Sequence, residues 1–167
     1  MANLNSGNYD IVMAGMSITA ERKKDRLFTQ PYTPPSVSLY VAASKDVDVT
    51  KGTVSAQVST IQAGHVAETG AQLVEFATPD ETVAAVRNGE ADAVLADWEY
   101  LKPLVDESNG ELVVVGQVQL GEGVGGALRM SDAALRDKFD GAIAAMKADG
   151  SLNAMITKWF GKDAPLF

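Results

Sequence analysis

Short apolar runs alternate with helix signals between residues 37 and 120, and this alternation limits what the chain can fold into. The runs are short, rich in valine and alanine, and bounded by polar residues or glycine, which is typical of buried strands. Strands that alternate with helices predict an α/β fold with a mainly parallel sheet. The predicted strands are Val37–Ala43, Thr53–Val58, Leu73–Phe76, Ala91–Ala96 and Leu112–Val115, and the helices between them are Thr60–Thr69, 79–88 and Asp97–Asp106.

Two local signals refine this region. The residues Thr78 to Glu81 read as a capping box with proline at the first helical position, so a helix is predicted to start there. Pro103 falls inside the next predicted helix. Because proline lacks the backbone N–H that an inner helical turn needs, we expect it to interrupt that helix.

The two ends of the chain have a different pattern. Tyr9–Ala14 is a short apolar run that predicts a strand, and Ala127–Met130 is expected to be extended. Ser131 is a candidate N-cap for a long helix, and a last helix over Ser151–Phe160 is expected to end at Gly161. The long helix has an apolar face made of Leu135, Phe139, Ile143 and Met146.

Composition excludes several classes of function. The net charge of −8 disfavours a nucleic-acid or anionic-membrane partner, because both need a basic surface. There is no cysteine for disulfide or thiolate chemistry, and His65 stands alone, so we expect no metal and no cofactor. Residues Met1–Asn5 lack a basic and an apolar region, so we expect no signal peptide here. No run approaches the ~20 apolar residues of a membrane span.

A candidate carboxylate-binding pair follows the Tyr9–Ala14 run. Ser17 carries a hydroxyl, and Arg22 offers a planar fork of donors that matches the two oxygens of a carboxylate. The alternative is that Arg22 is a solvated charge, because it stands in a run of charged residues that ends at Arg26. Ser17 in turn can be a simple strand-end hydroxyl.

The stretch YDIVMAGMSITAER, Tyr9 to Arg22, resembles the segment NGKYDAIIAGMSITPER of solute-binding proteins of the polar amino-acid class. Phe28–Tyr32 continues this resemblance as F-[ST]-x-P-Y. These proteins are the receptors of ABC importers, family 3 of the bacterial extracellular solute-binding proteins. The resemblance implies a type II periplasmic-binding-protein-like fold: two lobes with mixed, mostly parallel sheets, joined by two hinge strands.

The resemblance also implies how the chain is divided. Lobe 2 would be residues 37–120, and lobe 1 would be residues 1–36 with 121–167. Two connectors would be the hinges: a Pro-rich one that ends near residue 35, and a Gly-rich one that spans Gly121–Gly126. The second connector also matches the dinucleotide motif G-x-G-x-x-G, but no helix is predicted to open within it, so we favour a hinge.

Residues at three places in the chain would bind the ligand if the family pattern holds. Ser17 and Arg22 would hold the carboxylate of an amino acid, and Asp97 would hold its α-amino group. Ser59 and Thr60 match the family's G-T-T motif, although Val58 replaces the glycine. From the residues alone, Ser59-Thr60 and Asp97 can equally be helix N-caps, and a helix N-terminus can also attract an anion.

The family normally has two more βα units before the Tyr9 segment, roughly 60 residues at about 30 per unit. We therefore expect lobe 1 to be incomplete and the strand over residues 9–14 to present a bare edge, which recruits another chain. A homo-oligomer through this edge and an ABC permease are the expected partners, and the family implies a periplasmic or extracellular location.

The predicted function is binding of a small polar solute, an amino acid or organic acid, without catalysis. One alternative is a self-associating structural or interaction module that has lost ligand binding. Another is a lyase on the same scaffold. An enzyme would need an acid or base in the site, and the sequence offers only the scattered candidates Glu99, Glu122 and His65.

Overall fold

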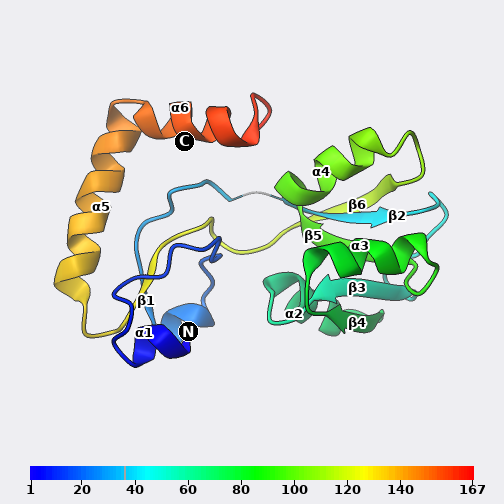
Figure 1. Ribbon diagram of the computed structural model, residues 1–167, viewed down its shortest axis with the longest axis horizontal. Helices are drawn as coiled ribbons and strands as arrows, with labels where there is room; N and C mark the ends of the chain where they lie inside the picture. The colour runs from blue at the N-terminus through cyan, green and yellow to red at the C-terminus, as the bar shows by residue number, and fades with distance from the viewer. Residues whose placement is uncertain (36) are drawn as a thin grey trace. The chain divides into compact units, whose positions relative to one another are not determined.

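The computed structural model describes residues 1–35 and 37–167, which form two compact units (Figure 1). Unit 1 consists of Met1–Pro35 and Gly121–Phe167, and unit 2 consists of Ser36–Leu120. The chain therefore passes from one unit to the other twice. The predicted boundary at residue 36 lies outside the described residues.

Unit 2 contains a mixed five-stranded sheet in the order β4-β3-β5-β2-β6, counted over the residues that the structure describes. β3 is parallel to β4 and β5, while β2 is antiparallel to its neighbours β5 and β6. Four strands thus share one direction and only β2 opposes them, which agrees with the predicted α/β class. The strands are β2 (Val37–Ala42), β3 (Thr53–Gln57), β4 (Gln72–Phe76), β5 (Ala93–Asp97) and β6 (Val113–Gln119).

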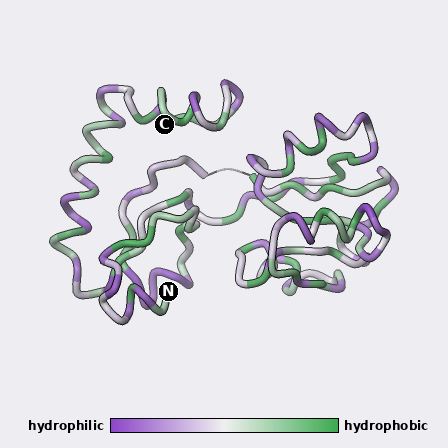
Figure 2. Tube along the Cα trace, in the orientation of Figure 1, coloured by the Kyte–Doolittle hydropathy of each residue, from purple (hydrophilic) through white to green (hydrophobic). Residues whose placement is uncertain are grey.

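Helices cover both faces of this sheet. α3 (Pro79–Arg87) and α4 (Trp98–Glu107) pack on one face with Leu39 and Val41, and α2 (Ile61–Ala67) packs on the other with Tyr40. The split follows from the pleat, since successive residues of a strand point to opposite faces. Figure 2 shows the resulting hydrophobic colouring along the strands of unit 2.

The capping box at the start of α3 is confirmed. The Thr78 hydroxyl accepts a hydrogen bond from the Glu81 N–H at 3.3 Å, and the Glu81 carboxylate accepts one from the Thr78 N–H at 2.9 Å. The predicted interruption at Pro103 is wrong, because α4 runs through it without a break. Pro103 is the sixth residue of a ten-residue helix, and the surrounding packing of α4 on β2 outweighs one lost backbone hydrogen bond.

Unit 1 has far less regular pairing. Its strands β1 and β7 are two residues each and pair antiparallel, with Leu27 opposite Leu128. The elements of unit 1 are α1 (Ala2–Asn5), the 3-10 helix η1 (Arg22–Lys24), β1 (Leu27–Phe28), β7 (Ala127–Leu128), α5 (Ala133–Ala148) and α6 (Ser151–Phe160). α6 begins after Gly150 and ends at Gly161, as predicted.

The predicted strand at Tyr9–Ala14 is wrong: this segment makes only an isolated bridge between Val12 and Ala127. Val12 exchanges both backbone hydrogen bonds with Ala127 at 2.9 Å. A strand needs a ladder of such pairs, and the neighbouring residues of this segment find no further partner strand among the described residues. The side chains of Tyr9 and Met13 accordingly remain about half exposed.

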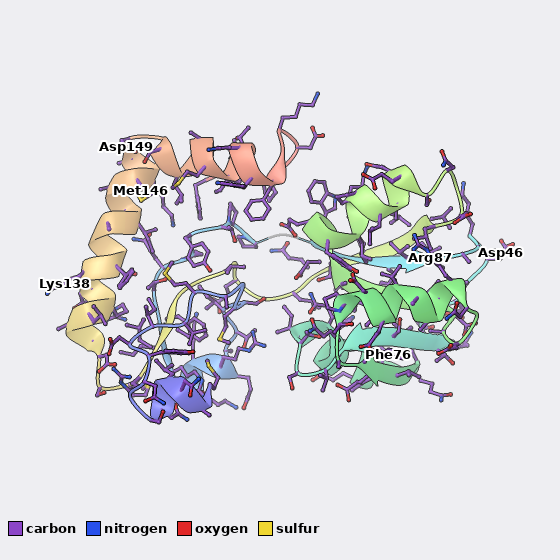
Figure 3. All side chains as sticks on the ribbon, viewed as in Figure 1. Asp46, Phe76, Arg87, Lys138, Met146 and Asp149 are labelled. Carbon is purple, nitrogen blue, oxygen red and sulfur yellow. The ribbon has the colours of Figure 1, made fainter. Side chains whose placement is uncertain are left out.

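The predicted Ser131 cap is also wrong. α5 starts after Asp132, whose side chain makes no capping bond and instead pairs with Arg129 at 2.7 Å. The α5–α6 corner has a small core of Ile143, Leu152 and Ile156, with Met146 beside it. Figure 3 labels Met146 near this corner and Lys138 extending from α5 into solvent.

Glycine permits a close backbone approach in the 121–126 segment. A Cβ on Gly123 would lie 2.5 Å from the carbonyl oxygen of Thr33, and its φ of +99° is also left-handed. Val124 forms bridges to Ser17 and Thr33 on either side. The segment is extended and opens no helix, so it lacks the geometry of a dinucleotide loop. Over the described chain, no helix is both long and apolar enough for a membrane span.

Candidate functional site

A small pocket lies in unit 2 where strands end and helices begin. Gln57 is the last residue of β3 and Asp97 the last of β5, while Thr60, Pro79 and Asp97 stand at the starts of α2, α3 and α4. The carboxyl ends of strands are the usual ligand sites of open α/β sheets. We call it the Asp97 pocket; it is lined by Gln57, Thr60, Gln62, Pro79, Thr82, Leu95, Ala96, Asp97 and Tyr100.

The volume of the Asp97 pocket is about 70 Å³. One water molecule occupies about 30 Å³ in the liquid, so the pocket has room for roughly two waters or one ammonium group. A whole amino acid is larger than this. The pocket can therefore receive the polar end of a ligand rather than enclose it.

The Asp97 side chain does not act as a helix cap. Asp97 is in the N-cap position of α4, yet its carboxylate makes no capping hydrogen bond. Instead Oδ1 accepts a hydrogen bond from Nε2 of Gln62 at 2.6 Å. The N-cap interpretation of this aspartate is therefore wrong for its side chain, which is turned toward the pocket lining.

Two opposing effects act on the ionisation of Asp97. Desolvation by the surrounding protein raises its pKa, and the nearby negative charge of Glu99 raises it further. The hydrogen bond from Gln62 opposes this by stabilising the charged form. A carboxylate that is partly desolvated gains more from a cationic ligand than one in bulk water, since its attraction is less screened.

Gln62 is a site residue that sequence reasoning missed. Its side chain is almost fully buried, and its amide nitrogen donates to Ser38 Oγ at 3.0 Å as well as to Asp97. Ser38 lies directly opposite Asp97 in the β2–β5 pairing. The available signal was a serine within the apolar Val37–Ala43 run, since a buried hydroxyl needs a hydrogen-bond partner.

The structure separates Thr60 from Ser59. Thr60 lines the Asp97 pocket and is the N-cap of α2: its hydroxyl accepts from the Ala63 N–H at 3.2 Å and donates to the Gln57 carbonyl at 2.7 Å. Ser59 is exposed, is not part of the pocket lining, and has a left-handed φ of 64°. The cap interpretation holds for Thr60, whose hydroxyl makes both of these hydrogen bonds at the start of α2.

Tyr100 completes one wall of the pocket. Its hydroxyl donates to Asp80 Oδ1 at 2.7 Å, which links the first turns of α3 and α4. Burial and the carboxylate of Asp80 together raise the pKa of Tyr100, so the phenol stays protonated. This wall therefore presents a neutral aromatic ring next to a carboxylate.

Ser17 and Arg22 come together within unit 1. Nη1 of Arg22 donates to the backbone carbonyl of Ser17 at 2.9 Å, and the Arg22 N–H is capped by the Thr19 hydroxyl at 3.1 Å. Partial burial lowers the pKa of Arg22 from its usual value, and an arginine remains charged at neutral pH. The Ser17 contact fixes one side of the guanidinium plane.

The residues considered for catalysis lie on different elements of the chain. His65 lies on α2, Glu99 lies in the first turn of α4, and Glu122 of unit 1 pairs with Lys23 at 2.5 Å. Among the residues with described positions, no group of three His, Cys, Asp or Glu side chains could hold a metal ion.

Comparison with known proteins gives close structural and sequence relatives. The chain is similar to a crystal structure of a periplasmic His/Glu/Gln/Arg/opine family-binding protein from Silicibacter pomeroyi in complex with lysine. The two share 62% identity with a TM-score of 0.94, over 99% of this chain and 76% of that one.

Two curated relatives are more distant. The arginine-binding periplasmic protein of Mannheimia haemolytica is 29% identical over 95% of this chain and 69% of its own length. The L-cystine-binding protein of Escherichia coli (strain K12) is 32% identical over 98% of this chain and 64% of its own length. The chain thus spans about two thirds of the length of these curated relatives, all of which are binding proteins.

The partial coverage agrees with the expected incomplete lobe, since about a quarter of the lysine-bound structure has no counterpart in these residues. The family model for bacterial extracellular solute-binding proteins, family 3, matches residues 1–162. That match spans both units and nearly the whole sequence. The chain belongs to the bacterial extracellular solute-binding proteins of family 3.

Proposed function

We propose that this chain binds an amino acid, with lysine as the first candidate, and that the Asp97 carboxylate binds the ligand's α-ammonium group. The observation that carries the proposal is the state of Asp97. Its side chain makes no capping hydrogen bond to α4. Instead, a hydrogen bond from Gln62 holds the carboxylate in the lining of a pocket that is large enough for an ammonium group. An ion-paired hydrogen bond between ammonium and carboxylate contributes about 1.5–3 kcal/mol, which is enough to orient a ligand.

The relatives support an amino-acid ligand. The 62% identical structure holds lysine, and the curated relatives are described as binding arginine and cystine. The net charge of −8 and the Asp97 carboxylate in the pocket lining favour a cationic ligand over an acidic one. Lysine and arginine are both amino acids with a cationic side chain.

Ser17 and Arg22 remain predicted contacts for the ligand carboxylate. The guanidinium of Arg22 can donate to both oxygens of a carboxylate, and its hydrogen bond to the Ser17 carbonyl orients it. Arg22→Lys tests this role, because lysine keeps the charge but loses the fork. We expect about a tenfold weaker Kd for lysine, and an unchanged Kd would contradict the assignment.

Isothermal titration calorimetry with lysine, arginine and glutamine tests the proposal as a whole. Asp97→Asn keeps the shape of the side chain and removes its charge, so we expect the lysine Kd to rise at least about tenfold. Asp106→Asn is the matched control, since Asp106 lies on the same helix, outside the pocket lining, and pairs with Lys102 on the surface. Equal affinities for the wild type and Asp97→Asn would overturn the proposal.

We further propose that the chain catalyses nothing and delivers its ligand to an ABC permease in the periplasm. The support is the binding function and periplasmic location stated for the relatives. Mass spectrometry of lysine after prolonged incubation should recover it unchanged, and a protein-dependent product would contradict this part.

Self-association is a second candidate function, favoured by the exposed apolar segment in unit 1. Tyr9 and Met13 are about half exposed and border an open groove of about 380 Å³ that also includes Leu4 and Val12. Exposed apolar side chains that gather along one groove are a common site for binding another chain. Sedimentation should show a dimer that Met13→Glu dissociates; a monomeric wild type would contradict it.

A further inference from the structure

The Gln62 side chain links two strands of unit 2 through one amide nitrogen. Nε2 donates to Ser38 Oγ on β2 and to Asp97 Oδ1 on β5, at 3.0 and 2.6 Å. Gln62 and Ser38 are both almost fully buried, at 5% and 2% exposure. An amide nitrogen has two hydrogens, so these two bonds use its full donor capacity.

We infer that Gln62 is a positioning residue that fixes the Asp97 carboxylate for an incoming ammonium group. This inference rests on the proposed function. The bond from Gln62 occupies Oδ1, which leaves Oδ2 as the oxygen that a ligand can approach. The Ser38 contact holds the amide itself, so the carboxylate plane is set before a ligand arrives. Pre-orientation of this kind lowers the entropic cost of binding.

The register of the sheet explains why this arrangement is rigid. Ser38 and Asp97 are directly paired on β2 and β5, and Gln62 lies in the first turn of α2, which packs on the same face. The donor and both acceptors therefore belong to three elements that share one core. A surface glutamine would lose side-chain freedom on making the same bonds, whereas the buried Gln62 has already lost it on folding.

The same contact controls the protonation of Asp97. Glu99 on α4 is the charged group that acts on Asp97. Tyr100 on α4 also lines the pocket, and its hydroxyl is bonded to Asp80 on α3. Desolvation and the charge of Glu99 disfavour the ionised Asp97 carboxylate, whereas the hydrogen bond from Gln62 favours it. Loss of the Gln62 donor should therefore shift the titration of Asp97 to higher pH.

Gln62→Met tests the inference, because methionine keeps the length of the side chain and removes the donor. We expect the lysine Kd to weaken about tenfold. We also expect the Asp97 carboxyl titration, followed by carbon NMR in the free protein, to move to higher pH. Gln72→Met is the matched control, since Gln72 is exposed on β4 of the same unit and outside the pocket lining. It should leave both readouts unchanged.

Ser38→Ala is the second variant and covers a failure of Gln62→Met to fold. It removes the Ser38 hydroxyl that accepts from Gln62 but leaves the hydrogen bond from Gln62 to Asp97 possible. We therefore expect a smaller loss of about threefold in lysine affinity. A folded Gln62→Met protein with wild-type affinity and a wild-type Asp97 titration would overturn the inference, as would Ser38→Ala with wild-type affinity if the methionine variant does not fold.

The two readouts separate this inference from the proposed function. If the wild-type protein binds no amino acid, both the proposed function and the positioning role of Gln62 are wrong. The NMR titration then reports only whether Gln62 forms a hydrogen bond with Asp97. If the wild type binds lysine and Gln62→Met binds it equally well with an unshifted Asp97, only the role of Gln62 fails.

Discussion

Unit 2 and unit 1 are of similar length but have very different cores. In unit 2, Val41, Val94, Leu95 and Leu101 are fully buried between a five-stranded sheet and helices on both of its faces. In unit 1, the sixteen-residue helix α5 contributes one buried residue, Ile143, and Trp159 on α6 is 73% exposed. Unit 2 has a closed core, and unit 1 has apolar surface left over.

This contrast shows where stability and binding geometry come from. A buried sheet fixes the register that brings Ser38 opposite Asp97, and hence the position of the carboxylate in the pocket. Unit 1 holds Ser17 and Arg22 with single bridges and local hydrogen bonds instead. Regions with few buried contacts open locally at lower free energy. We therefore expect the Asp97 pocket to be the more rigid binding element.

Matched leucine truncations should show the largest difference between the two cores. Leu95→Ala removes a fully buried side chain from the central strand β5, and we expect it to lower the free energy of unfolding of unit 2 by about 3–5 kcal/mol. Leu152→Ala in the small α5–α6 core should cost unit 1 only about 2 kcal/mol, the low end of the range, because fewer atoms surround the cavity.

Pulsed hydrogen exchange across a urea series, read peptide by peptide, measures each unit separately. The wild type provides the reference for both. Equal losses in the two variants would show that the core of unit 1 is packed as well as that of unit 2, and would remove the contrast.

A smaller effect is expected from the link between Asp140 on α5 and Gln30. Asp140 Oδ1 accepts the Gln30 backbone N–H at 2.6 Å, and Asp140→Ala leaves this partly buried donor without that acceptor. We expect unit 1 to lose about 1–2 kcal/mol, measured by the same exchange method. Asp140→Asn retains an acceptor and serves as the control. If the alanine variant unfolds at the wild-type urea concentration, α5 is not held by this contact.

The smallest effect is a gain in stability in Asp97→Asn. Burial raises the folded-state pKa of Asp97 above its unfolded value, so the ionised carboxylate destabilises the fold at neutral pH. This destabilisation is relieved as the pH falls through the raised pKa. At pH 7, Asp97→Asn should therefore have a higher free energy of unfolding, and so a slightly higher unfolding temperature. The gain should be under about 1 kcal/mol, because solvent screens the carboxylate. The advantage should vanish in acid, and a constant difference would contradict this account.

The sequence predicted unit 2 much better than unit 1 because its signals are local. The capping box at Thr78 and the strand run at Thr53–Val58 depend on neighbouring residues, and both elements form close to their predicted bounds. Tyr9–Ala14 has the composition of a strand, but a strand also needs a partner ladder, which no local pattern supplies. Pro103 failed as a helix breaker because tertiary packing of α4 outweighs its local cost.

The site was predicted in part. Asp97 and Thr60 lie in one pocket and Ser17 contacts Arg22, whereas Ser59 is outside the pocket lining. Their roles toward a ligand stay predictions. Gln62 could not be predicted from a motif, because its function depends on the antiparallel register between β2 and β5. That register is set by long-range pairing and not by the residues next to Gln62.

The central claim is that the Asp97 pocket receives the α-ammonium group of an amino acid. The most direct test is an NMR titration of the whole chain with lysine and with 6-aminohexanoic acid, which lacks that group. The account predicts that lysine shifts the side-chain amide signal of Gln62 and the carboxyl signal of Asp97, while 6-aminohexanoic acid leaves both in place. Equal shifts with the two compounds, or lysine-induced shifts confined to other residues, would contradict it.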